Sequence, residues 1–160
     1  HGALRLWQPG QLASDGVRQV AELGRRDIIV AAIRESMTAG SVHQLIEGGG
    51  IPNAPESVSV NFEVTQLHPL VTVLSMVAPS PDWMVGVHDL DLRGNDGRFV
   101  DSLTVDALVY DAGTDSGVRY TSSDSETLPR APITRLTSNS GDTDFVDGLP
   151  RAGRFVFEKQ

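Results

Sequence analysis

The sequence predicts a mainly β protein, an antiparallel β-sandwich preceded by two short helices near the N-terminus. Apolar residues recur at helical spacing before residue 40, whereas from residue 57 onward they alternate with polar residues, as in strands. Short runs rich in Gly, Pro, Asn and Asp separate the alternating segments. Many short strands divided by such turns are typical of a sandwich, and 160 residues suffice for one domain with its own core.

Two amphipathic helices are expected first. Ser14 is suited to cap the first helix and Gly24 to end it, because serine accepts a backbone hydrogen bond and glycine adopts left-handed conformations. Asp27 is suited to cap the second helix, whose pattern stops before Gly40. The apolar stripes consist of Val17, Val20, Ala21 and Leu23 in the first helix and of Ile28, Ile29, Ala32 and Ile33 in the second.

The rest of the chain predicts strands. Residues 57–64 alternate with period two, and residues 70–77 are mostly apolar on both faces, which favours a central strand covered on both sides. Further strands are expected over residues 83–87, 103–109, 118–121, 133–137 and 154–157. The run Gly94-Asn95-Asp96-Gly97 is a strong hairpin signal. Trp7 and Trp83 adjoin apolar positions, so we expect them to anchor the core rather than bind a sugar.

Composition excludes several classes of protein. The chain has 13 Lys and Arg residues against 21 Asp and Glu residues, a net charge of −8, which argues against a nucleic-acid partner. No run approaches the roughly 18 apolar residues of a membrane span. The start at His1 shows neither the basic region nor the apolar region of a signal peptide. The absence of cysteine excludes disulfide bonds and thiol catalysis.

Two loops carry carboxylates directly beside strands. Pro79 and Pro81 stiffen the connection that leads to Asp82, and Asp111 follows an alternating strand. Glycines on both sides of Asp115 allow the backbone to turn sharply there. Hard cations such as calcium take carboxylate and carbonyl oxygens from loops of this kind. Aspartates in such loops also serve as turn or capping residues, so the residues alone leave both functions open.

Two long runs carry a resemblance to a known family. They are Pro79-Ser80-Pro81-Asp82-Trp83 with Val85-Gly86-Val87, and Tyr110-Asp111-Ala112-Gly113-Thr114-Asp115-Ser116-Gly117. In this order they resemble the spondin N-terminal domain family, and the similarity covers nearly the whole chain, so residues 1–160 are expected to form one spondin-type domain. The resemblance implies a C2-like β-sandwich that is exported, either secreted, attached to the cell surface or periplasmic. Animal members use cysteines, so this chain is expected to be a bacterial or otherwise divergent member.

The resemblance also implies a metal site. The family's ligands for one divalent cation, usually calcium, fall on Glu63, Asp82 and Asp111, with Asp115 or nearby backbone carbonyls completing the coordination. From the pattern alone, Glu63 lies on the polar face of its predicted strand, where a solvated carboxylate is the alternative to a ligand.

Family members have a further segment ahead of the Leu6-Trp7 region, which is expected to supply a strand that this chain lacks. An edge left open in this way would invite pairing with a second copy of the chain or with a fragment.

The expected function is a non-catalytic calcium-binding module for adhesion or extracellular binding, with an unknown protein or glycan ligand. One alternative is a structural subunit of a surface assembly with strand exchange. Another is a metal-dependent enzyme using copper or zinc, in which His1 binds copper together with His43, His68 or His88. Asp142, Asp144 and Asp147 form a second acidic loop, which we interpret as solvated.

Overall fold

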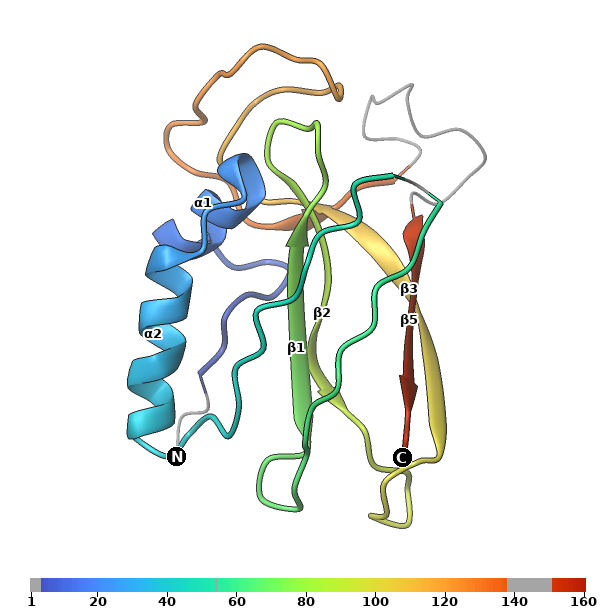
Figure 1. Cartoon of the computed structure of the whole chain (residues 1–160). Coiled ribbons are helices and arrows are strands. Elements are labelled where there is room, and N and C mark those ends of the chain that lie inside the picture. The colour runs from blue at the N-terminus through green and yellow to red at the C-terminus, as the bar shows by residue number, and fades with distance from the viewer. Residues whose placement is uncertain (1–3, 54, 138–150) are drawn as a thin grey trace.

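The computed structural model describes residues 4–53, 55–137 and 151–160. It contains two helices followed by five strands that form an antiparallel sheet (Figure 1). The elements are α1 (Asp15–Leu23), α2 (Asp27–Thr38), β1 (Leu70–Met76), β2 (Trp83–Asp91), β3 (Ser102–Asp111), β4 (Thr134–Arg135) and β5 (Arg151–Glu158). No helix in the described part of the chain is long and apolar enough to cross a membrane.

The strand β3 changes neighbours along its length. Its residues 109–111 pair with β2 and its residues 110–111 also pair with β4, whereas residues 102–108 pair with β5. The register shifts between Ala107 and Leu108, and in Figure 1 β3 curves from its place beside β5 towards β2. Such irregularities bend a strand and increase its twist. The described residues form this one sheet, so the second sheet of the predicted sandwich is not seen among them.

Local signals place the helices as predicted, with one correction. The Ser14 hydroxyl accepts a hydrogen bond from the Val17 N–H, and Gly24 ends α1 with a φ of 64°. In α2 the capping position is Arg26, and Asp27 is the first helical residue rather than the cap. A carboxylate in the first turn is still favourable there because it faces the positive end of the helix dipole.

The core lies between the helices and the sheet. The buried faces of α1 and α2 meet Trp7, Met84, Tyr110 and Ile133, so the prediction that Trp7 anchors the core is confirmed. The Trp7 indole N–H donates to the Val73 carbonyl at 3.2 Å. A Cβ on Gly86 would lie 2.0 Å from this same carbonyl oxygen and 2.9 Å from the Trp7 ring, so only glycine fits at that position of β2. Trp83 is buried in a second, smaller cluster.

Several strand predictions need correction. Residues 57–64 form no strand, because their alternating pattern finds no ladder partner among the described residues. β1 is an edge strand rather than a central one. Residues 118–121 form no strand and contain a turn at residues 120–121, and the predicted strand over 133–137 shrinks to the two residues of β4. The hairpin between β2 and β3 is confirmed, since the Gly94 N–H donates to the Arg98 carbonyl at 2.8 Å.

Candidate functional site

Asp82 and Asp111 lie at the same end of the sheet. Asp82 immediately precedes β2 and Asp111 is the last residue of β3, and Trp83 is the register partner of Asp111. The Ala112 N–H donates to the Asp82 backbone carbonyl at 3.2 Å, which ties the two loops together. The turn before β2 is closed by Ser80, whose hydroxyl accepts the Trp83 N–H at 3.1 Å. The register of an antiparallel pair therefore sets the spacing of these two carboxylates.

The loop that follows Asp111 is built from two consecutive Asp-x-Gly turns. Asp111 Oδ1 accepts the Gly113 N–H at 2.7 Å, and Asp115 Oδ1 accepts the Gly117 N–H at 2.7 Å. Aspartate side chains favour this turn because they bond the backbone two residues ahead. Gly113 has a φ of 73°, and a Cβ there would lie 2.1 Å from the Ala131 carbonyl oxygen. Glycine is therefore required at this point by both conformation and space.

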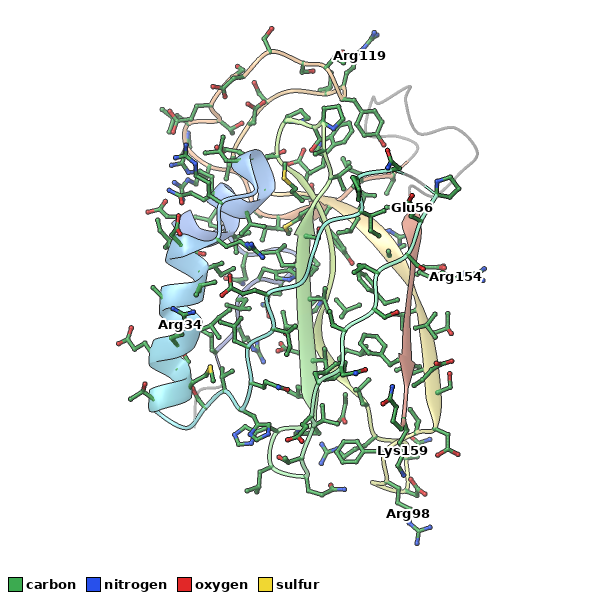
Figure 2. All side chains as sticks on the ribbon, in the orientation of Figure 1. Arg34, Glu56, Arg98, Arg119, Arg154 and Lys159 are labelled. Carbon is green, nitrogen blue, oxygen red and sulfur yellow. The ribbon has the colours of Figure 1, made fainter. Side chains whose placement is uncertain are left out.

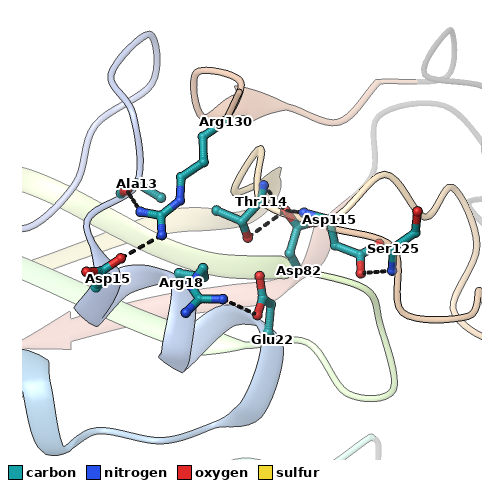
Figure 3. Close-up of polar contacts among 9 residues, drawn as sticks. All are labelled: Ala13, Asp15, Arg18, Glu22, Asp82, Thr114, Asp115, Ser125 and Arg130. Atoms are coloured by element: carbon teal, nitrogen blue, oxygen red, sulfur yellow. Dashed lines mark hydrogen bonds and ion pairs between the residues drawn. The ribbon is translucent and has the colours of Figure 1, made fainter. Parts of the chain in front are cut away.

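Asp82 organises this loop from inside the protein. Its side chain is fully buried, and Oδ2 accepts three hydrogen bonds, from the Thr114 N–H at 2.7 Å, the Thr114 hydroxyl at 3.2 Å and the Asp115 N–H at 3.0 Å (Figure 3). Its other oxygen, Oδ1, is buried with no hydrogen-bond partner in the described part of the chain. Burying a carboxylate oxygen without a hydrogen-bond donor costs free energy unless a positively charged group interacts with that oxygen.

Asp115 has a different role, because each of its oxygens accepts a backbone N–H of its own loop. Oδ2 accepts the Ser125 N–H at 2.8 Å, so this buried carboxylate joins the two ends of the loop 116–125 (Figure 3). Arg130, a few residues further on, donates to the Ala13 carbonyl at 3.1 Å and to Asp15 at 2.6 Å, which holds the segment against the start of α1. Asp115 is thus a positioning residue for the loop.

Burial, and to a smaller extent the charges of neighbouring carboxylates, raise the pKa of both site carboxyls. Burial raises the pKa of Asp82, and the hydrogen bonds from Thr114 and Asp115 oppose that change. Burial and then the negative charge of Asp82 raise the pKa of Asp111 to about 6, against the hydrogen bond from Gly113, which lowers it. A positive charge beside these two carboxyls would favour their ionised forms and so lower both pKa values.

Glu63, the third predicted ligand, lies at the other end of β1 from Asp82. Its carboxylate is 83% exposed and lies 3.9 Å from His43 Nε2. The His43 ring stacks on His68, with centroids 5.5 Å apart, and His68 stands just before β1, whereas Asp82 follows it (Figure 1). The seven residues of β1 span about 20 Å. The structure therefore brings Asp82 and Asp111 together and places Glu63 away from them.

The remaining candidate ligands do not gather into one site. His88 packs edge-on against Trp7 at 5.1 Å, apart from the His43 and His68 pair. His1 and the acidic loop of Asp142, Asp144 and Asp147 lie outside the described residues. Over residues 4–53, 55–137 and 151–160, no three His, Cys, Asp or Glu side chains are grouped so that they could hold a metal ion.

The bonding roles of Thr114 and Ser125 were not predicted from the sequence. The spacing of Asp111-Ala112-Gly113 and Asp115-Ser116-Gly117 was a usable signal for the two turns. The hydrogen bonds that Thr114 and Asp115 donate to Asp82 leave no such signal in the sequence, because Asp82 is more than thirty residues away along the chain.

Comparison with known proteins gives one consistent result. The model of the family described as Spondin_N matches residues 1–145. Spondin-2 of Homo sapiens is 36% identical over 136 residues, which cover 84% of this chain and 41% of Spondin-2. Spondin-1 of Rattus norvegicus is 37% identical over 163 residues, which cover 96% of this chain and 20% of Spondin-1. The chain therefore spans less than half the length of these relatives.

Proposed function

The chain belongs to the spondin N-terminal domain family, and on this basis we propose that it is a non-catalytic, exported module for adhesion or matrix binding that holds one calcium ion. The proposed ligands of this ion are Asp82 and Asp111. The proposed partner of the module is a protein or a glycan. The observation that carries the metal proposal is the buried Oδ1 of Asp82, which has no hydrogen-bond donor among the described residues and lies near a second carboxylate.

The chemistry of the donor set favours calcium over zinc. Asp82 and Asp111 offer carboxylate oxygens next to loop carbonyls, whereas zinc in proteins is bound mainly by cysteine and histidine. A calcium ion would bind Asp82 Oδ1, and its positive charge would offset the repulsion between the two carboxylates. Asp115 is not a proposed ligand, because each of its oxygens already accepts a backbone N–H, whereas Oδ1 of Asp82 accepts none among the described residues. Glu63 is not included because it lies at the other end of β1.

The proposed role of the ion is structural. Asp82 and Asp111 belong to the ends of neighbouring strands, so an ion between them would join β2 to β3 and to the loop that Asp82 organises. Two surface hollows, of about 400 and 450 Å³, are lined by residues of the N-terminal segment and of α2, and neither carboxylate lines them. A binding module is therefore favoured over an enzyme with its catalytic centre at these acids.

The test combines metal analysis with thermal unfolding. We expect plasma mass spectrometry to find one calcium per chain, and calcium at about 100 times its dissociation constant to raise the melting temperature by roughly 5–10 °C relative to chelator. Asp82→Asn should abolish this rise. Asp96→Asn, which alters an exposed aspartate in the hairpin between β2 and β3, should retain it. Copper or zinc in place of calcium, or equal melting with and without chelator, would refute the calcium site.

A further inference from the structure

A long stretch without regular structure runs across one side of the sheet. Residues 42–53 and 55–64 contain no helix or strand, and in Figure 1 they cross in front of the strands. Loops longer than about 15 residues are uncommon in compact domains and usually have a function or are disordered. The Arg26 guanidinium donates to the Gly48 carbonyl at 3.2 Å, which ties this stretch to the helical part of the chain, and the Glu63 N–H donates to the Gln44 side chain at 2.8 Å, which joins two parts of the stretch.

Residues 57–62, here called the open segment, have the sequence of a strand but lack the bonds of one. No backbone hydrogen bond joins the open segment to another described residue. Val58 and Val60 are 52% and 48% exposed, although their alternation with polar residues is typical of a strand. The segment lies beside the end of β5, where the Phe62 ring meets Phe157 edge-on at 6.3 Å. Within the part of the chain that the structure describes, nothing pairs with its backbone N–H and C=O groups, so they can bond another chain.

Charge indicates what kind of chain would pair there. Glu56 and Glu63 stand at the two ends of the open segment, and both are exposed (Figure 2 labels Glu56). Seven residues of extended chain place them about 23 Å apart. A second copy of this protein would bring like charges together, because each copy has a net charge of −8. A peptide with basic residues at both ends would instead match the two acids.

We propose that the open segment is a docking site for an extended peptide with alternating β-branched residues and a Lys or Arg at each end. The peptide adds as a strand, so that its backbone bonds the free groups of residues 57–62 while its end charges pair with Glu56 and Glu63. This site is distinct from the carboxylates at Asp82 and Asp111, and its binding does not require calcium.

The probe is the synthetic peptide Lys-Thr-Val-Thr-Val-Thr-Val-Lys, with the same peptide ending in Glu as the control. Calorimetry in chelator should show binding of the Lys-ended peptide and at least about tenfold weaker binding of the Glu-ended one. The double change Glu56→Gln with Glu63→Gln should weaken binding about two- to tenfold. Hydrogen exchange of the amides of residues 57–62 should slow when the peptide is bound.

Ser59 provides a matched pair of variants. Ser59→Pro removes a backbone donor from the open segment and should abolish binding, whereas Ser59→Ala keeps the donor and should bind like the wild type. Circular dichroism melts should show that both variants fold. Failure of the Lys-ended peptide to bind, or equal binding by Ser59→Pro, would overturn the proposal. Sedimentation that shows a dimer paired through residues 57–62 would overturn it too, because the occupant would then be a second copy.

Discussion

Replacing Asp111 with asparagine should stabilise the calcium-free protein at neutral pH. Burial, followed by the charge of Asp82, raises the pKa of this carboxyl from 3.8 to about 6. A carboxyl whose folded pKa is raised contributes its full stability below pH 3.8, and that contribution is lost as the pH rises through about 6. At about 1.4 kcal/mol per pKa unit, the ionised group lowers the free energy of unfolding by about 3 kcal/mol at neutral pH. Asparagine carries no charge and keeps an oxygen for the Gly113 N–H.

The assay is urea unfolding in chelator at about pH 4 and about pH 7. The free energy of unfolding of Asp111→Asn should equal that of the wild type at the lower pH and exceed it by about 2–3 kcal/mol at the higher pH. Asp96→Asn is the control, because Asp96 accepts the Arg98 N–H in a similar turn but is exposed. A gain that is the same at both pH values, or a loss at neutral pH, would refute the electrostatic reasoning.

Three further predictions concern single positions. Gly113→Ala should lower the free energy of unfolding by about 3 kcal/mol or more, because the new Cβ would lie 2.1 Å from a backbone oxygen. Gly97→Ala is the control and should lower it by only about 1 kcal/mol, because Gly97 has a similar φ of 75° but open surroundings. Equal losses in urea unfolding would contradict this. Asp115→Ala should destabilise by about 2–4 kcal/mol and speed hydrogen exchange at Ser125, whose amide loses its acceptor; unchanged exchange there would rule out the clamp. Trp7→Ala should lower the free energy of unfolding by about 3–5 kcal/mol in the same assay, and a loss below about 1 kcal/mol would show that its burial matters little.

The parts of the fold that depend on neighbouring residues could be predicted from the sequence. Ser14 and Gly24 mark the two ends of α1, because a helix cap acts through hydrogen bonds within one turn. The alternating pattern before Asp111 predicts β3, because one face of that strand is buried. The apolar run of β1 led to the wrong expectation of a central strand. The number of partners a strand has depends on residues far along the chain, which its own composition does not encode.

The candidate site divides in the same way. Asp82 and Asp111 come together because each is next to a strand of the same antiparallel pair, and that register follows from the hydrophobic pattern. The expected place of Glu63 depended on residues 57–64 being a strand of the sheet. Their backbone has no ladder partner among the described residues, so the alternating pattern alone could not position that side chain.

At the proposed calcium site, the acids at the ends of β2 and β3 would link stability to cation binding through one electrostatic cause. Asp82 is fully buried with one oxygen satisfied, and Asp111 is half-buried and repelled by it, so both charges lower the stability of the protein without a cation. A divalent ion would offset both the desolvation and the repulsion of these carboxylates. The free energy recovered in this way would contribute to the affinity of the protein for the ion. Asp111→Asn should therefore raise the stability of the free protein while weakening calcium binding. Asp115→Ala should lower stability with or without calcium, because that carboxylate holds the backbone rather than an ion.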